Sequence, residues 1–338
     1  MTAATPGLAL EARNLVKTYP AGRGKPRLTA LDGLSFSARV GTVFGLLGPN
    51  GAGKSTTVKI LSTLAQADSG EAYVAGVDVR DSARVRRSIG FVAQKQVSDP
   101  MDTGRENLVL AGQLQGMATR DAGIRADELL ERFALTAAAG RQVKTYSGGM
   151  VRKLDVAIGL MHTPSVLFLD EPTTGLDPEA RAEMWFEIER MAAQEHMTVL
   201  LTTHYLEEAD RLADRLAIVD HGRVVAEGTP EELKAGLRGD AVVLELHDAG
   251  RISEALAVVG RIRELREIAV DGRILRARAD AGGAALPIAL TLLDGAGLSV
   301  ASATVARPSL DDVYLAHTGH SFASAHSAGS ASLEEVAS

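Results

Sequence analysis

The sequence contains no cysteine and no long hydrophobic run. Without cysteine no disulfide framework can form, which fits a reducing compartment. No run approaches the roughly 18 apolar residues that a membrane-spanning helix needs. Residues 1–10 also lack the basic segment and long apolar core of a secretory signal. We therefore expect a soluble chain that reaches a membrane only through a partner.

An excess of basic charge is also missing. The net charge is −7 and the pI is about 5.7, which argues against a general nucleic-acid binder, so no nucleic acid is expected as a partner. Hydrophobic residues make up 46% of the chain and charged residues 23%, an ordinary globular balance. A length of 338 residues is enough for about two domains.

The most informative stretch covers residues 42–65. Its apolar run at 43–47 predicts a buried strand, and the apolar residues 58, 61, 64 and 65 recur at helical spacing. Between them the motif G-x-x-x-x-G-K-[ST] is matched by Gly48, Pro49, Asn50, Gly51, Ala52, Gly53, Lys54, Ser55 and Thr56. The strand–loop–helix context favours a phosphate-binding P-loop over a glycine-rich turn that binds nothing.

The chemistry of a P-loop explains these residue types. Glycines let backbone N–H groups approach phosphate oxygens closely, and the following helix points its positive end at the same phosphates. Lys54 adds a cation for the β- and γ-phosphates, and the Ser55 hydroxyl can ligate Mg²⁺. The motif predicts a bound nucleotide but does not say what its energy drives.

The remaining pattern predicts an α/β core with a helical insertion. Alternating residues at 8–12 suggest an edge strand, and a further alternation at 34–38 completes an antiparallel layer beside the P-loop strand. The core contains apolar strands alternating with helices, which implies a parallel sheet. Further strands are expected at 71–78, 89–92, 166–169, 198–203, 216–219 and 224–227, and helices at 106–114, at 126–133 and starting near 151, 179 and 205.

A charged connection at 228–240, with the linker itself at 231–239, leads to a second module. The short helix of this connection is expected to start after Thr229 with Pro230 in its first position. The pattern over 240–318 reads β-α-β-β-α-β, with a hairpin turn signal at Asp271-Gly272. This order predicts a small α+β, ferredoxin-like domain. Residues 319–338 are mostly Ser, Ala, Gly and His, and we expect them to be disordered.

Polar residues at the ends of predicted strands are further candidates for the site. Asp170 and Glu171 directly follow the apolar strand at 166–169, where an aspartate can hold Mg²⁺ and a glutamate can polarise an attacking water. Gln94 and His204 end two other strands. Taken singly, a surface glutamine and a structural histidine are the more common explanations, and it is the shared strand-end position that favours a functional role.

Two short motifs are ambiguous in isolation. Ser147-Gly148-Gly149 precedes a predicted helix, so it is either an ordinary helix cap or a second anion site with exposed backbone N–H groups. Asp177 is followed by proline, which fits a cap with proline at the first helical position.

Taken together in this order, these motifs resemble the nucleotide-binding subunit of an ABC transporter. The resemblance covers residues 8–230, with the helical subdomain at about 95–160. It rests on Tyr19, the P-loop, Gln94, Ser147-Gly148-Gly149, residues 167–171, and Gly175 to Pro178 with His204.

The resemblance implies a role for each matching residue. Tyr19 would stack on the adenine of ATP, Gln94 would face Mg²⁺ and the membrane partner, and Asp170 would serve Mg²⁺. Glu171 would be the catalytic base and His204 the switch histidine.

The same resemblance implies a homodimer with head-to-tail ATP sites. Ser147, Gly148 and Gly149 would contact the γ-phosphate bound by the opposite subunit, and Asp177 would lie between the subunits. A separate integral-membrane permease would hold the chain at the cytoplasmic face of the cell membrane.

The sequence departs from the commonest signature, LSGGQ, at Tyr146 and Met150. This form, followed by Leu154-Asp155 and by the ending at 310–315, is similar to the daunorubicin-resistance type of drug-export ATPases. The resemblance therefore implies ATP hydrolysis that powers export of drugs, antibiotics or other hydrophobic compounds.

The alternatives are a non-transport ABC ATPase that acts on a soluble macromolecule and a regulatory binder that does not hydrolyse ATP. The single P-loop and the short insertion argue against the first, and Gln94, Glu171 and His204 argue against the second.

Overall fold

The P-loop strand lies inside a six-stranded sheet. The computed structural model describes residues 4–20, 27–319 and 322, and it gives the sheet order β10-β9-β3-β8-β7-β6. β3 is parallel to β8 and β9, and β7 is parallel to β6 and β8, so the predicted parallel sheet is confirmed. The bounds are β3 (Val43–Leu47), β6 (Ile89–Val92), β7 (Val166–Asp170), β8 (Thr198–Thr203), β9 (Arg215–Asp220) and β10 (Arg223–Gly228).

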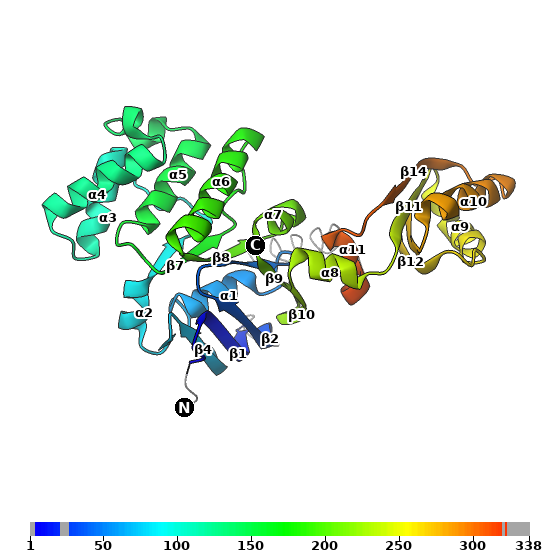
Figure 1. Ribbon diagram of the computed structural model, residues 1–338, viewed down its shortest axis with the longest axis horizontal. Helices are drawn as coiled ribbons and strands as arrows, with labels where there is room; N and C mark the ends of the chain where they lie inside the picture. The colour runs from blue at the N-terminus through cyan, green and yellow to red at the C-terminus, as the bar shows by residue number, and fades with distance from the viewer. Residues whose placement is uncertain (1–3, 21–26, 320–321, 323–338) are drawn as a thin grey trace. The chain divides into compact units, whose positions relative to one another are not determined.

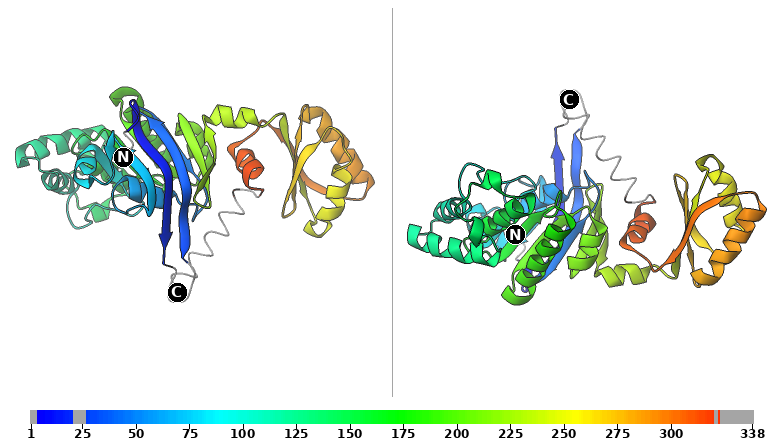
Figure 2. Two further views of the ribbon diagram at one scale, coloured as in Figure 1. Left: turned by 90° about the horizontal axis from the view of Figure 1, so that it is seen from below. Right: turned by 90° about the horizontal axis from the view of Figure 1, so that it is seen from above.

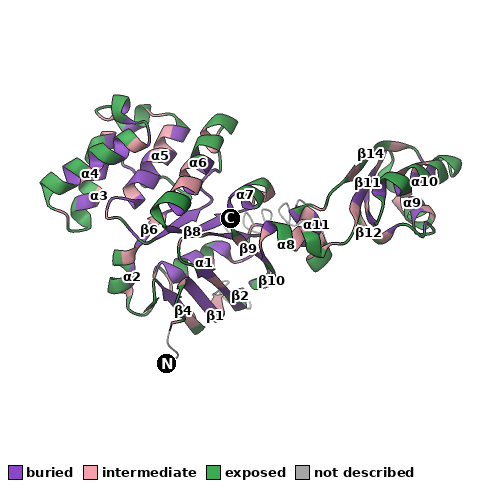
Figure 3. Ribbon diagram, in the orientation of Figure 1, coloured by how far each residue is buried: buried purple, intermediate pink, exposed green. Residues whose placement is uncertain are grey.

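Alternate side chains of this sheet enter two different cores. Leu167 and Leu169 of β7 pack with apolar residues of the helices α3 to α6, whereas Phe168 between them packs with α1 and the antiparallel layer. Both faces are therefore covered, and the inner strands β3, β8 and β7 are buried along their length (Figure 3). The helices in this unit are α1 (Lys54–Leu61), α2 (Ser82–Ser88), α3 (Gly104–Leu114), α4 (Thr119–Arg132), α5 (Gly148–Gly159), α6 (Pro178–Glu195) and α7 (Leu206–Leu212) (Figure 1).

The predicted antiparallel layer is a separate sheet of order β2-β1-β4-β5. Its strands are β1 (Leu8–Tyr19), β2 (Leu28–Arg39), β4 (Ser69–Val74) and β5 (Val77–Asp78). β1 pairs with both β2 and β4, so the prediction of an edge strand was wrong. Alternation reports that one face is buried, and it does not tell whether both edges are paired. The long pair β1 and β2 is visible in blue in Figure 2.

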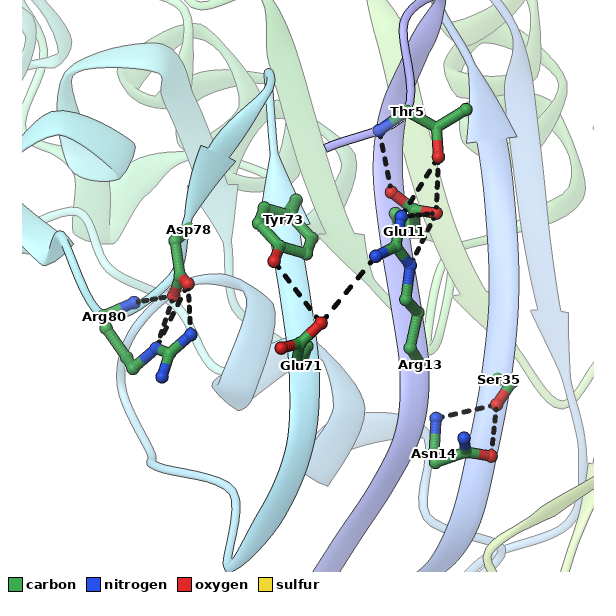
Figure 4. A network of polar contacts seen from close by, with 9 residues as sticks. All are labelled: Thr5, Glu11, Arg13, Asn14, Ser35, Glu71, Tyr73, Asp78 and Arg80. Carbon is green, nitrogen blue, oxygen red and sulfur yellow. Dashed lines mark hydrogen bonds and ion pairs between the residues drawn. The ribbon is translucent and has the colours of Figure 1, made fainter. Parts of the chain in front are cut away.

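A polar network joins β1 to its neighbour β4 (Figure 4). Glu11 accepts a hydrogen bond from the Thr5 hydroxyl (2.9 Å) and one from Arg13 Nη2 (2.6 Å). Arg13 Nη1 lies 3.7 Å from Glu71 of β4, which in turn accepts a hydrogen bond from the Tyr73 hydroxyl. The network contains none of the motif residues, so its contribution is to the sheet rather than to the candidate site.

Several helices have bounds that differ from the prediction. α4 begins at Thr119, about two turns before the expected start, and α3 begins at Gly104 behind a capping box made by Thr103 and Glu106. α1 ends at Leu61, so residues 64 and 65 do not continue it as expected. Thr63 has φ 64°, which is incompatible with a continuing right-handed helix.

Contacts divide the chain into two compact units, Met1–Glu227 and Gly228–Ser338. The second unit has the predicted element order, β-α-β-β-α-β, in an antiparallel sheet ordered β12-β13-β11-β14. The sheet and its two helices enclose a core of their own. The elements are β11 (Asp240–Leu246), α9 (Ile252–Val259), β12 (Arg266–Asp271), β13 (Ile274–Ala279), α10 (Gly282–Gly295) and β14 (Val300–Ala306).

Two more helices belong to this unit. α8 (Pro230–Gly236) begins as predicted, with Thr229 as its cap and proline in its first turn. α11 (Leu310–Thr318) was not predicted as a helix; Ser309 caps it through a capping box with Asp312. The expected disordered tail lies outside the described residues apart from Gly319 and Phe322. Among the helices of the described part, none is long and apolar enough to cross a membrane.

Candidate nucleotide-binding and hydrolysis site

The P-loop runs from the end of β3 into the start of α1, as the sequence predicted. Two glycines are required by their surroundings. A Cβ on Gly48 would lie 2.4 Å from the Val219 carbonyl oxygen of β9, and Gly53 has φ 109° immediately before the helix. Only glycine readily fits the close approach at position 48 and the left-handed backbone at position 53. The loop is thereby held against the sheet with its backbone N–H groups at the N-terminus of α1.

Lys54 is the buried cation of this loop. Its Nζ donates to the carbonyl oxygens of Gly48 (2.6 Å) and Pro49 (3.1 Å), so the ammonium lies across the loop that it follows. Burial lowers the pKa of Lys54, and the negative charges of Glu171 and Asp170 oppose this shift. A buried cation beside glycine N–H groups fits the phosphates of a nucleotide.

The predicted strand-end residues meet at one edge of the sheet. Asp170 ends β7 and Glu171 follows it, while Gln94 follows β6 and His204 follows β8. β6, β7 and β8 are neighbours in the sheet and parallel, so their carboxyl ends lie together. The four residues therefore lie at one edge of the sheet, as their positions after the predicted strands indicated.

Glu171 is the centre of this cluster. Its carboxylate accepts a hydrogen bond from Gln94 Nε2 (3.0 Å), lies 3.1 Å from His204 Nδ1 and lies 3.9 Å from Lys54 Nζ. Its backbone has φ 49°, an unusual left-handed conformation for a glutamate. The Glu171 N–H donates to the Thr202 carbonyl (3.1 Å), which helps to hold that conformation.

The same contacts set the ionisation of Glu171. Burial by itself would raise its pKa, but the hydrogen bond and charge of His204, the charge of Lys54 and the Thr174 hydroxyl together outweigh burial. The pKa of Glu171 is therefore lowered, and the side chain is a carboxylate at neutral pH. A carboxylate with this charge is able to accept a proton from water.

Asp170 faces the P-loop serine. Its Oδ1 lies 3.4 Å from Ser55 Oγ and accepts a hydrogen bond from Thr202 Oγ1 (2.5 Å). Hydroxyl and carboxylate oxygens are the donors that Mg²⁺ prefers. No cluster of three or more His, Asp or Glu side chains suited to a metal occurs in residues 4–20, 27–319 and 322. The Ser55 hydroxyl and the Asp170 carboxylate therefore fit an ion that takes its remaining ligands from phosphate and water.

The other predicted site residues lie elsewhere. No hydrogen bond or ion pair within the described part of the chain joins Tyr19, Ser147 or Asp177 to the cluster around Glu171. Tyr19 ends β1, where the ring centroid lies 5.4 Å from Lys17 Nζ.

Ser147 and Asp177 are both helix caps, as predicted. Ser147 Oγ accepts from the Met150 N–H at the start of α5, and Asp177 Oδ1 accepts from the Ala180 N–H at the start of α6. A Cβ on Gly149 would lie 2.8 Å from Ala180 Cβ, so these two helix starts are in contact. Ser147, Gly148 and Asp177 are exposed.

Comparisons with known proteins agree with this geometry. Residues 31–174 match the family model described as ABC transporter. The chain is 45% identical over 317 residues to the daunorubicin resistance ATP-binding protein DrrA2 of Streptomyces coeruleorubidus, covering 93% of this chain and 96% of that protein. It is 46% identical over 322 residues to the daunorubicin/doxorubicin resistance ATP-binding protein DrrA of Streptomyces peucetius, covering 93% and 94%.

The chain belongs to the ABC transporter ATP-binding proteins. A solved structure of a dimeric ATP-binding cassette in a post-hydrolysis state with ADP and Pi is similar to it, with 26% identity and a TM-score of 0.60. That similarity covers 65% of this chain and 98% of the solved one. This chain is thus an ATP-binding and ATP-hydrolysing subunit of the ABC type, and the predicted ABC ATPase fold of its first unit is confirmed.

Sequence reasoning missed residues that support this ATPase site from outside its motifs. Thr202 holds the Asp170 carboxylate, and Thr174 contacts Glu171 Oε2 at 3.4 Å. Arg152, in the second turn of α5, is buried and donates to backbone carbonyls near the site. The sequence could have indicated Thr202, because it lies near the end of a strand beside β7. No sequence pattern indicated Arg152.

Proposed function

We propose that this chain powers a separate membrane permease through ATP-driven dimerisation, and that Glu171 is the base of the hydrolytic reaction. The observation that carries this proposal is the placement of one buried carboxylate within contact of Lys54, Gln94 and His204. No other carboxylate in the described part of the chain contacts all three of these residues.

The proposed reaction is attack of water on the γ-phosphorus of ATP. Glu171 accepts the proton of that water, and Gln94 and His204 orient the carboxylate and the water. The positive charge of Lys54 and the backbone N–H groups of residues 48–56 stabilise the phosphate oxygens. Tyr19 stacks on the adenine, and its position at the end of a strand rather than in the cluster fits a contact with the far end of the nucleotide.

Mg²⁺ is proposed as the metal of this site. Ser55 and Asp170 would hold it, with Gln94 as a further oxygen donor through its amide carbonyl. When bound, Mg²⁺ neutralises charge on the β- and γ-phosphates. The 3.4 Å separation of the Ser55 and Asp170 oxygens supports the assignment, since both would point to one ion.

We further propose that two copies of the chain pair head to tail. Ser147, Gly148 and Asp177 are exposed and make no contact with the P-loop cluster of their own chain among the described residues. In a head-to-tail pair, the N–H groups at the start of α5 would contact the γ-phosphate held by the partner copy. The dimeric state of the similar solved cassette supports this arrangement.

The proposed cargo is a drug, an antibiotic or another hydrophobic compound, exported through the permease from the cytoplasmic face of the cell membrane. The names of two relatives that match almost the whole chain, both given for resistance to daunorubicin, support this class. A non-transport ATPase that acts on a soluble macromolecule is the less favoured alternative, because neither relative bears such a name.

For the second unit we propose a ferredoxin-like accessory domain, over about 240–318, that assists dimerisation or docking. The P-loop and the strand-end residues all belong to the first unit, proposed to extend over 8–230 with a linker at 231–239. A catalytic role for the accessory domain therefore has no residues to support it.

Purification of the tagged full-length chain from detergent-solubilised membranes tests the transport proposal. We expect a polytopic membrane protein to co-purify, and we expect apolar drugs such as daunorubicin to stimulate ATP hydrolysis by the complex. Recovery with a soluble macromolecule and no membrane protein would favour the alternative function.

A further inference from the structure

A single buried guanidinium contacts the backbone directly before Gln94 and on both sides of Glu171. Arg152 Nη1 donates to the Ala93 carbonyl (2.6 Å), directly before Gln94. Its Nη2 donates to the Asp170 carbonyl (3.1 Å), and its Nε donates to the Pro172 carbonyl (2.7 Å). The residues on either side of Glu171 are thus held by one planar group with fixed donor directions.

This contact matters because the conformation of Glu171 is unusual. A positive φ of 49° costs free energy for a non-glycine residue and persists only where the surroundings fix it. Arg152 holds the carbonyls immediately before and after that residue. Arg152 as a whole is 8% exposed, so its hydrogen bonds are largely protected from water.

A second residue of α5, three positions after Arg152, contacts the segment that follows Gln94. Asp155 Oδ1 accepts a hydrogen bond from the Ser98 N–H (3.0 Å), and Asp155 is 1% exposed. Positions three apart share one face of a helix. One face of α5 therefore contacts the segment containing Gln94 at two points. Arg152 contacts it at Ala93, and Asp155 contacts it at Ser98.

The same helix begins at the motif proposed to meet the partner copy. Ser147 caps α5, and Arg152 lies five residues further along. An α-helix rises 1.5 Å per residue and behaves as a rigid element over this length. A displacement of the Ser147 end would therefore be carried to the carbonyls around Gln94 and Glu171.

We propose that Arg152 is a positioning residue for ATP hydrolysis, which sets the geometry of Glu171 and Gln94 and couples it to the position of the helix that starts at Ser147. This inference rests on the proposed catalytic role of Glu171. Arg152 touches neither the nucleotide nor water in this scheme; it acts through the backbone of the residues that do.

The test is Arg152→Lys in the full-length chain. Lysine keeps the charge, but all its N–H groups are on one nitrogen, whereas the guanidinium donates from three. Lysine therefore cannot hold three separate carbonyls in the same geometry. We expect kcat for ATP hydrolysis to fall about 10- to 100-fold, since a 1 Å misplacement of reacting groups can cost about 10²-fold. The Kd for ATP should change less than about threefold, because Arg152 makes no contact with the P-loop.

Two comparisons separate positioning from a general loss of stability. In a Glu171→Gln background, Arg152→Lys should change the residual rate less than about threefold, because the group that it positions is already disabled. Arg125→Lys is the matched control: its guanidinium donates to the Leu160 carbonyl, at the far end of α5. That variant should keep kcat within about twofold.

Other outcomes would overturn the inference. An unchanged kcat in Arg152→Lys would do so, and so would an equal fold-loss in both backgrounds. If Arg152→Lys fails to fold, Arg152→Gln, which retains an amide donor, replaces it; failure of both to fold would count against a positioning role that is separable from stability. Normal hydrolysis by Glu171→Gln would instead remove the proposed function of Glu171, whatever Arg152 does.

Discussion

Gln94 Nε2 donates a hydrogen bond to Glu171 Oε2 at 3.0 Å. The two residues are 77 positions apart in the chain and follow adjacent parallel strands, with Val92 opposite Leu169 in the register. The amide fixes one carboxylate oxygen, and His204 Nδ1 lies 3.1 Å from the other. A carboxylate held in this way presents a defined direction to an attacking water, which is what a general base requires.

Lys54→Ala should abolish tight ATP binding or hydrolysis. The substitution removes the buried cation that spans the loop and leaves phosphate charge without its main protein counter-charge. ATP binding by calorimetry and phosphate release are the measurements. Lys59→Ala, which removes an exposed lysine from the same helix, is the control and should resemble the wild type. ATPase activity near the wild-type level in Lys54→Ala would contradict the P-loop assignment.

Glu171→Gln should separate ATP binding from hydrolysis. Glutamine is close in size and can still form hydrogen bonds, but it cannot act as a carboxylate base, so the rate should fall about 10²- to 10⁴-fold. ATP with Mg²⁺ should still bind and trap a dimer, visible by light scattering and absent with ADP. Glu128→Gln, at a glutamate of α4 that pairs with Arg125, is the control.

A further change tests the geometry of that dimer. Ser147→Arg, added to Glu171→Gln, should destroy the trapped dimer because a bulky cation would occupy the exposed start of α5. A Glu171→Gln protein that is inactive but never dimerises with ATP, even with its membrane partner supplied, would argue against a site completed by two subunits.

Gly48→Ala should weaken both the fold and ATP binding. The new Cβ would lie 2.4 Å from the Val219 carbonyl oxygen, so the loop or β9 must shift. Overpacking of this kind typically costs about 1–3 kcal/mol, which urea denaturation would detect. Gly140→Ala is the matched control, since a Cβ there has no neighbour within 4 Å. Equal stability of the two variants would show that β9 shifts to accommodate the new Cβ without a measurable loss of stability, which would contradict this prediction.

Glu208 predicts a pH dependence of stability. This buried residue of α7 accepts hydrogen bonds from the Thr173 hydroxyl (2.8 Å) and from Trp185 Nε1 (3.1 Å). Burial raises its pKa, and these partners and the charge of Arg181 only partly oppose the shift. The folded protein therefore binds this proton more tightly than the unfolded chain does, so stability falls as pH rises through the interval between the two pKa values.

Glu208→Gln removes that titration. We expect the wild type to lose stability relative to Glu208→Gln as pH rises above the ordinary glutamate pKa of about 4.3, measured by thermal or urea unfolding at several pH values. Glu207→Gln removes one exposed charge from the same helix and serves as the control. A constant difference between wild type and Glu208→Gln at every pH would contradict the raised pKa.

Truncation after Gly228 should leave ATP binding largely intact. β10 ends at that residue, and the P-loop, the strand-end cluster and both helix caps lie before it. Assembly with the partner copy or the permease should weaken, if the second unit assists docking as proposed. ATP titration and co-purification measure the two effects separately. Loss of ATP binding by a truncated chain that is still folded would count against this assignment.

The sequence determined the elements that depend on local rules. A glycine-rich loop between an apolar strand and a helix can be recognised because its backbone torsions need glycine at fixed positions, and Gly53 has φ 109° as such a loop requires. Asp170, Glu171, Gln94 and His204 could be grouped in advance because parallel strands end at one edge of a sheet. The caps Ser147 and Asp177 followed from short-range hydrogen bonding.

Only the tertiary structure decided which side chains support these residues. β1 proved to be an inner strand because its pairing with β4 depends on a segment about 60 residues away, which alternation does not report. Arg152 reaches carbonyls that are 59, 18 and 20 positions distant. Backbone carbonyls are the same at every residue, so no sequence pattern identifies which of them a buried guanidinium will contact; packing of α5 against the sheet makes that choice.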